Sequence, residues 1–245
     1  MRVVLEVKGF TKHFGGLTAI KNLSFELNKG EILGIIGPNG AGKTTLFNLI
    51  TGVYRPDAGT ALFKGEDITG LRPHQICERG VARTFQITQP FANLSVLENV
   101  KIGAYSRISS TRGAIEEALQ ILETVGLFEK RNDRASTLST GHRKKLELAK
   151  ALATQPELIL LDEVVAGLNS REANEMIDQI NRIQKQGITI LLIEHVMKAI
   201  MSLSNRIIVI HYGEKIAEGK PEVISKNEKV IEAYLGEEYI LAKRQ

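Results

Sequence analysis

A glycine-rich segment that directly follows an apolar run is the part of this chain best suited to chemistry. The run Ile32 to Ile36 leads into Gly37-Pro38-Asn39-Gly40-Ala41-Gly42-Lys43-Thr44-Thr45. Glycines let the backbone turn so that successive N–H groups point at an anion, and a helix that begins near Lys43 adds its positive dipole end. Lys43 would contact the β- and γ-phosphates of a nucleoside triphosphate, and the Thr44 hydroxyl would bind its Mg²⁺. We therefore predict a phosphate-binding loop.

Two adjacent carboxylates end a second apolar run. Asp162 and Glu163 follow Leu158-Ile159-Leu160-Leu161, which is typical of a parallel strand covered on both faces. Open α/β sheets bind ligands at the carboxyl ends of their strands. Asp162 would then bind Mg²⁺ through a water molecule, and Glu163 would deprotonate the water that attacks the γ-phosphate. The alternative is that both acids only cap a helix or solvate a strand end.

His195 and Gln86 hold equivalent places after two other predicted strands. His195 follows the strand 188–193, where its imidazole would contact the γ-phosphate. Gln86 ends the strand 81–85, where its amide would sense Mg²⁺ and the attacking water. A packed or surface histidine and an ordinary strand-end glutamine are the alternatives.

A second anion site is indicated by Leu138-Ser139-Thr140-Gly141-His142-Arg143, which precedes a predicted helix. Ser139 and Gly141 would lie at the N-terminus of that helix, where N–H groups and the helix dipole favour negative charge. Because the chain already has one phosphate loop, a second phosphate-facing surface suggests the nucleotide of a neighbouring subunit. We therefore expect a dimer with ATP held between the subunits.

Strands and helices alternate along most of the chain and would position these residues. Strands are predicted at 3–7, 20–27, 32–36, 60–63, 81–85, 158–161, 188–193 and 206–210, with a hairpin to 217. Helices are predicted at 43–51, 74–79, 95–104, 114–125, 141–155 and 170–186, from about 196, and in two short segments at 221 and 229–235. Ser95 and Glu98 have the spacing of a capping box, and 106–112 is predicted to be a linker.

Residues 86–155 are mainly helical in this prediction, although they lie inside an alternating α/β chain. We therefore predict a single domain over 1–245, in which 1–85 and 156–245 form the nucleotide-binding core. Residues 86–155 would be an inserted helical lobe that carries the signature segment, Leu138 to His142.

Composition excludes several other classes of protein. Hydrophobic residues make up 43% of the chain and charged residues 24%, which is ordinary for a globular protein. The net charge of +4 comes from basic residues spread along the sequence, so no nucleic-acid partner is expected. No apolar run approaches the length of about 18 residues that a membrane span needs, and Glu6 comes too early for a signal peptide. A single cysteine, Cys77, rules out an internal disulfide.

These motifs together resemble the ATP-binding subunits of ABC transporters, across essentially the whole chain. They follow the order of that family: Walker A (Gly37 to Thr44), Q-loop (Gln86), signature (Leu138 to His142), Walker B (Leu158 to Asp162, with Glu163), D-loop (Ala166 to Asn169) and switch histidine (His195). Phe14 falls where the family stacks an aromatic ring on adenine. The resemblance implies an α/β fold of the P-loop NTPase class, with a mixed-sheet core, an N-terminal antiparallel β part and an inserted helical lobe.

The resemblance also implies cofactors and partners. ATP and Mg²⁺ would bind between two ATPase subunits, either two copies of this chain or this chain with a related one. Ser139, Gly141 and His142 of one subunit would face the nucleotide held by the other. Membrane-spanning permease subunits would contact the groove beside Gln86, with Phe91 to Leu97 as candidate contacts, and would act with a substrate-binding protein. The chain would then be cytoplasmic and peripheral on the inner face of the cell membrane.

A finer similarity is to the subunits that serve branched-chain amino acid importers. It rests on four short strings: Arg83-Thr84-Phe85-Gln86, Ala166 to Asn169, Glu194-His195-Val196-Met197 and Glu232-Ala233-Tyr234-Leu235-Gly236. Relatives that serve urea, short amides or lipopolysaccharide export share much of this pattern, so these solutes remain alternatives.

Three residues depart from the family pattern. Thr140 and His142 replace a glycine and the glutamine of the usual Leu-Ser-Gly-Gly-Gln signature, and Val164 replaces a proline that often follows the Walker B glutamate. An altered signature would impair the partner's site more than the chain's own site. The altered signature leaves open a nucleotide-dependent regulatory or binding module with weak turnover. A separate alternative is an ABC-type ATPase that works on ribosomes or DNA. Such an ATPase usually carries two cassettes or a long coiled-coil insertion.

Overall fold

The computed structural model describes residues 2–86 and 88–235, which form two compact units. One unit combines the residues up to 73 with those from 189 onward, and the other comprises 74–188. The segment predicted as an inserted lobe, 86–155, falls within the second unit. The division into a core and a lobe stays a prediction, and Gly236 of the importer-like strings lies outside the described residues.

The first unit contains an antiparallel sheet with the strand order β2-β1-β4-β5. Its strands are β1 (Val3–Phe14), β2 (Leu17–Asn28), β4 (Ala58–Phe63) and β5 (Glu66–Asp67). β1 and β2 are longer than the predicted strands 3–7 and 20–27, because register shifts let them stay paired where their apolar alternation is broken. The antiparallel N-terminal part of the predicted fold is therefore confirmed.

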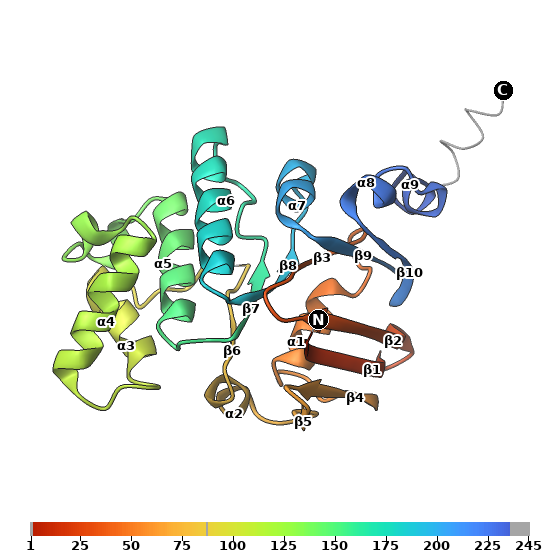
Figure 1. Ribbon diagram of the computed structural model, residues 1–245, viewed down its shortest axis with the longest axis horizontal. Coiled ribbons are helices and arrows are strands. Elements are labelled where there is room, and N and C mark those ends of the chain that lie inside the picture. The colour runs from red at the N-terminus through yellow and green to blue at the C-terminus, as the bar shows by residue number, and fades with distance from the viewer. Residues whose placement is uncertain (1, 87, 236–245) are drawn as a thin grey trace. The chain divides into compact units, whose positions relative to one another are not determined.

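A second sheet in this unit places the phosphate-binding segment at a strand end. β3 (Ile32–Ile36) pairs in parallel with β8 (Thr189–Ile193) and with β9 (Arg206–His211), and β9 pairs antiparallel with β10 (Glu214–Gly219). Every residue of β3 and β8 is buried, which explains why Ile32–Ile36 and the segment 190–193 contain no polar side chain. The unit's helices are α1 (Lys43–Ile50), α7 (Met197–Leu203), α8 (Pro221–Ile224) and α9 (Glu228–Leu235) (Figure 1).

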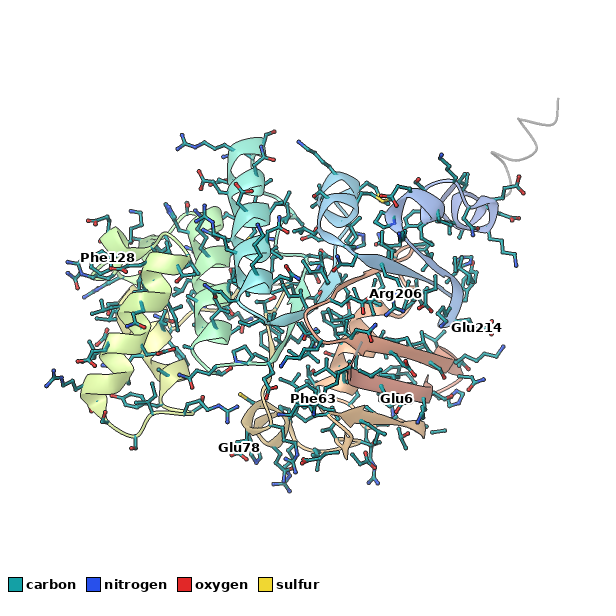
Figure 2. All side chains as sticks on the ribbon, in the orientation of Figure 1. Glu6, Phe63, Glu78, Phe128, Arg206 and Glu214 are labelled. Atoms are coloured by element: carbon teal, nitrogen blue, oxygen red, sulfur yellow. The ribbon has the colours of Figure 1, made fainter. Side chains whose placement is uncertain are left out.

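Ion pairs connect the strands of the first unit. Arg206, labelled in Figure 2 at the start of β9, lies with Nε 2.8 Å from Glu31 Oε1 and also pairs with Glu218 of β10. At the other end of β10, Lys21 Nζ lies 2.5 Å from Glu214 Oε1. Burial opposes ionisation of the Glu31 carboxyl, but hydrogen bonds from Arg206 and Asn28 hold its pKa below the usual value. These pairs connect β10 to β9 and to β2, and they connect β9 to Glu31, which directly precedes β3.

The second unit combines a pair of parallel strands with helices. Strands β6 (Val81–Arg83) and β7 (Leu158–Asp162) pair in parallel. The helices are α2 (Pro73–Glu78), α3 (Val96–Ala104), α4 (Thr111–Thr124), α5 (Thr140–Leu152) and α6 (Ser170–Lys185), with short 3₁₀ helices at Phe128–Lys130 and Ala135–Thr137. α3 packs against both α4 and α5 (Figure 1).

Some predicted boundaries in this unit differ from the structure, whereas the predicted capping box is confirmed. β6 ends at Arg83, not at residue 85, because Phe85 is exposed and no longer gains from burial in the sheet. The linker ends at Ser110, whose side chain accepts a hydrogen bond from Gly113 N and begins α4. The capping box at Ser95 and Glu98 is confirmed at the start of α3. Across residues 2–86 and 88–235, no helix has both the length and the apolar character that crossing a membrane requires.

Candidate functional site

The phosphate loop of the first unit has the backbone that its glycines predict. Gly40 and Gly42 have φ angles of 79° and 105°, in the region that favours glycine. A Cβ on Gly42 would lie 2.4 Å from the carbonyl oxygen of Ala19, so no larger residue fits at that position. The Lys43 side chain is 6% exposed, and its Nζ donates to Gly37 O at 2.7 Å and to Pro38 O at 2.9 Å. The ammonium group is therefore held within the loop.

The N-terminus of α1 is suited to an anion. Gly42 is its N-cap, no side chain caps it, and no acidic residue lies in its first turn. The main-chain N–H groups there carry the positive end of the helix dipole. Thr44 is exposed at this end of the helix, and Thr45 is half-buried. The loop residues from Gly37 to Thr45 therefore fit the phosphate groups of a nucleotide.

The β9–β10 turn contacts the phosphate loop. This contact was not predicted from the sequence. Gly213 N donates to Ala41 O at 3.0 Å, and Gly213 O accepts from Lys21 N at 2.9 Å. A Cβ on Gly213 would lie 2.8 Å from Ala19 O. Tyr234 of α9 also contacts the loop, through a hydrogen bond with the main chain of Gly37. Burial raises the pKa of the Tyr234 phenol to about 12, and the hydrogen bond with Gly37 lowers it by a smaller amount. Its phenol therefore stays protonated at neutral pH.

Phe14 lies at the end of β1 with part of its ring accessible. The ring is 41% exposed and makes an edge contact with Tyr54, with centroids 5.2 Å apart. Lys12 Nζ lies 5.6 Å from the ring centroid. Tyr54 was not predicted from the sequence, because it lies in a turn far from Phe14 along the chain. A planar base could stack on an aromatic ring of this kind.

His195 follows β8 and precedes α7, as the sequence predicts. Its side chain is exposed, whereas the preceding Glu194 is buried. An exposed imidazole at the carboxyl end of a buried parallel strand is suited to contact with a ligand.

The second unit brings Gln86, Asp162 and Glu163 together. Gln86 lies three residues beyond the end of β6, and its Nε2 donates to Glu163 Oε2 at 2.8 Å, so this amide and this carboxylate are in direct contact. Asp162 is almost completely buried, and its Oδ2 lies 2.8 Å from Arg83 Nη2. Asp162 N donates to Thr84 Oγ1 at 3.1 Å. The segment 83–86 therefore holds both Walker B acids from the neighbouring strand.

Glu163 has an unusual backbone conformation. Its φ angle is 52°, in the left-handed region that non-glycine residues rarely adopt. Its carbonyl oxygen accepts a hydrogen bond of 2.5 Å from Lys144 Nζ of α5. The sequence alone did not identify Arg83 as a partner of Asp162 or Lys144 as a partner of Glu163. In the parallel β6–β7 pair, Arg83 lies opposite Leu160, two residues before Asp162. This strand register would have indicated that Arg83 lies near Asp162.

The signature segment forms the N-terminus of α5. Ser139 is the N-cap, its hydroxyl accepts from His142 N at 3.3 Å, and its Oγ lies 3.0 Å from His142 Nδ1. A Cβ on Gly141 would lie 2.5 Å from Glu172 Oε1, so a larger residue there would require the Glu172 side chain to move. Burial lowers the pKa of His142, and the positive charges of Lys130 and Lys145 lower it further.

The D-loop leads into α6. Asn169 is the N-cap of that helix and forms a capping box with Glu172. Its side chain accepts from Arg171 N at 3.1 Å and from Glu172 N at 3.0 Å.

The predicted magnesium ligands are oxygen donors, which suits Mg²⁺. They are the Thr44 hydroxyl, the Gln86 amide and the Asp162 carboxylate. Among the residues that the structure describes, no cluster of three or more His, Cys, Asp or Glu side chains could hold a metal. A magnesium ion that keeps its waters and binds nucleotide phosphates does not need such a cluster. Each of these three groups is therefore of the kind that Mg²⁺ binds.

Comparison with known proteins gives a consistent assignment. Residues 20–166 match the family model described as "ABC transporter", and residues 214–240 match "Branched-chain amino acid ATP-binding cassette transporter". The chain is 43% identical over 250 residues to the high-affinity branched-chain amino acid transport ATP-binding protein LivG of Escherichia coli (strain K12), covering 96% of this chain and 98% of LivG. It is 40% identical over 252 residues to BraF of Pseudomonas aeruginosa, which carries the same description, covering 96% and 99%.

Solved structures agree with this assignment. An ATP-binding cassette of an ABC transporter in its ADP conformation superposes with a TM-score of 0.88 at 33% identity, covering 97% of this chain and all of the other. A nucleotide-free ATP-binding cassette from an ABC transporter gives a TM-score of 0.87 at 34% identity, covering 96% of this chain. The predicted P-loop NTPase fold is confirmed. The chain belongs to the ABC transporter family and is an ATP-binding cassette ATPase.

Proposed function

We propose that this chain hydrolyses ATP to drive the import of branched-chain or related amino acids through a membrane-spanning partner. The observation that carries the solute class is the match of residues 214–240 to the branched-chain amino acid cassette model. The printed functions of LivG and BraF support the same class. The geometry of the phosphate loop and of Glu163 supports the chemistry.

The loop from Gly37 to Thr45 would bind the phosphates of ATP. Its N–H groups and the Lys43 ammonium would bind the β- and γ-phosphates, for which Lys43 gives up its hydrogen bonds to Gly37 O and Pro38 O. Phe14 would stack on the adenine. Thr44, Gln86 and Asp162 would hold Mg²⁺, which offsets negative charge on the transferred phosphoryl group when it is bound.

Hydrolysis would transfer the γ-phosphoryl group to water. Glu163 would accept a proton from the attacking water, and His195 would hold the γ-phosphate. Gln86 contacts the Glu163 carboxylate at 2.8 Å, which supports a role in orienting that base.

A second ATPase subunit would complete each nucleotide site. Ser139, Gly141 and His142 at the N-terminus of α5 would bind the γ-phosphate of the nucleotide held by the partner subunit. That subunit would be a second copy of this chain or a related chain. Permease subunits would hold the pair on the inner face of the cell membrane and receive the motion through the segment that includes Phe91, which is half-exposed.

Reconstitution into vesicles tests this function. The chain would be combined with the permease subunits, the companion ATPase subunit and the substrate-binding protein of the same transport system. We expect ATP-dependent uptake of leucine, isoleucine or valine into vesicles whose ATPase side faces the ATP. Uptake of urea or a short amide, without uptake of these amino acids, would contradict the assignment of the transported solute. Recovery of the chain with ribosomes instead of permease subunits would contradict a role in transport.

A further inference from the structure

Lys144 contacts the main chain of the proposed catalytic base. It lies in the second turn of α5, its side chain is 9% exposed, and its Nζ donates to Glu163 O at 2.5 Å. A hydrogen bond from an ammonium group to a carbonyl oxygen is charge-assisted and strengthens where water is excluded. The contact therefore connects α5 to the residue that directly follows β7.

The peptide that Lys144 holds is a strained one. Glu163 has a φ angle of 52°, and non-glycine residues keep such angles only where the surrounding structure fixes them. The two residues that follow, Val164 and Val165, are 3% and 2% exposed. Lys144 holds the Glu163 carbonyl, and Gln86 holds the Glu163 carboxylate. The direction of the carboxylate therefore depends on the Lys144 contact as well as on Gln86.

The same helix carries the signature residues. Ser139 caps α5, and Lys144 lies just over one turn further along it. Because an α-helix moves as a rigid element over so short a distance, a shift of its N-terminus also shifts the Lys144 ammonium. Binding of Ser139 to a phosphate of the partner's nucleotide would thus reach the peptide of Glu163 through a single helix.

We infer that Lys144 is a positioning residue, which holds the Glu163 peptide and couples the signature end of α5 to the base in the same chain. This inference rests on the proposed function, since it requires Glu163 to act on water. The Glu163 carboxylate would be oriented toward the attacking water only when α5 is in the position that it adopts with Ser139 bound to the partner's nucleotide. Loss of Lys144 should therefore slow hydrolysis while the nucleotide still binds.

The adjacent lysine provides a matched control for this test. Lys145 is also on α5 and is 8% exposed, but its Nζ pairs with Glu175 Oε2 at 2.8 Å. Glu175 keeps a second partner, Arg171 Nε, at 3.1 Å. Lys145→Met therefore removes the same charge from the same helix without touching Glu163.

The test measures kcat, KM for ATP, ATP affinity and thermal unfolding for Lys144→Met, Lys144→Arg and Lys145→Met. We expect Lys144→Met to lower kcat at least about tenfold, because a misplaced catalytic group costs about that much or more. The ATP affinity of Lys144→Met should change less than about twofold. Lys144→Arg should have a kcat between those of Lys144→Met and wild type, and Lys145→Met should have the kcat of wild type. Wild-type kcat in a folded Lys144→Met protein, or an equal loss in Lys145→Met, would overturn the inference.

A double variant separates this inference from the assignment of Glu163. In Glu163→Gln chains, Lys144→Met should reduce the residual turnover no further, since both changes act on the same base. A further, independent loss of the size seen in the wild-type background would contradict a positioning role. If Glu163→Gln alone leaves turnover intact, Glu163 is not the general base and the proposed mechanism of hydrolysis is wrong. If only Lys144→Met leaves turnover intact, the inference fails alone.

Discussion

Arg83 and Asp162 form a buried ion pair at the ends of two neighbouring strands. Arg83 Nη2 lies 2.8 Å from Asp162 Oδ2, and the two side chains are 7% and 1% exposed. A carboxylate at that depth needs a positive charge or strong donors close to it. The proposed magnesium ligand is therefore charge-compensated by a residue of its own chain.

Replacing Arg83 tests the contribution of this pair to stability. Removing one partner of a buried ion pair typically costs about 3–5 kcal/mol, because the other charge stays in a low-dielectric environment. We expect Arg83→Met to lower the free energy of unfolding in urea by an amount of that order, and Arg83→Lys by less. Arg171→Ala, which breaks an exposed pair with Glu175, is the control and should cost less than about 1 kcal/mol. Equal stability of Arg83→Met and wild type would contradict a structural role for the pair.

Replacing Glu163 by glutamine tests the assignment of the general base. The amide keeps the shape of the side chain but cannot accept the proton of the attacking water, so turnover should fall by about a hundredfold or more. ATP should still bind and should stabilise the two-subunit state. Phosphate release measures the first effect, and light scattering with and without ATP measures the second. Near wild-type turnover would show that Glu163 is not the base.

Phe14→Ala tests the proposed adenine contact. Stacking of a base on an aromatic side chain is worth about 1–3 kcal/mol by alanine substitution, so ATP affinity should fall by about fivefold or more. Phe14→Tyr keeps the ring and should keep the affinity. Equilibrium binding of a fluorescent ATP analogue provides the measurement. If the affinity of the alanine variant equals that of wild type, Phe14 lies outside the site.

The elements of this fold are largely predictable because its buried strands are uninterrupted apolar runs and its helices carry clear caps. Runs such as Leu158 to Leu161 and caps such as Ser95 depend on local sequence alone. The phosphate loop is equally local, since one short segment supplies its glycines, lysine and helix N-terminus.

The supporting contacts are not local, and the sequence did not identify them. Arg83 and Asp162 are 79 residues apart, and Lys144 and Glu163 are 19 apart. Neither Arg83 nor Lys144 belongs to a phosphate-binding pattern, so their roles depend on strand register and on how α5 packs. The left-handed backbone of Glu163 is likewise a tertiary effect, because local propensity disfavours it.

The titration of His142 should reflect its surroundings. Burial and the charges of Lys130 and Lys145 lower the pKa of its imidazole below its ordinary value. The neutral form is therefore favoured, and protonation of the folded protein should begin at a lower pH than in an unfolded peptide. NMR titration of the ring should show this shift, and Lys130→Ala should raise the pKa by removing a positive charge. A folded-state pKa above that of the peptide would contradict the proposed environment.

The same shift predicts how stability depends on pH. Since the folded-state pKa of His142 is depressed, its contribution to stability is present above about pH 6.5 and is lost as the pH falls through the folded-state pKa. His142→Gln cannot titrate, so its unfolding midpoint should fall less between pH 7 and about pH 5 than that of wild type. Parallel pH profiles for the two proteins would contradict this linkage.

Phosphate release from ATP, measured for this chain alone and with its companion ATPase subunit, tests the central claim most directly. The chain should release phosphate in at least one of these settings, and Lys43→Ala, which removes the ammonium group of the phosphate loop, should release none in either. ATP binding without phosphate release in both settings would contradict the account and would make the protein a nucleotide-dependent binding module.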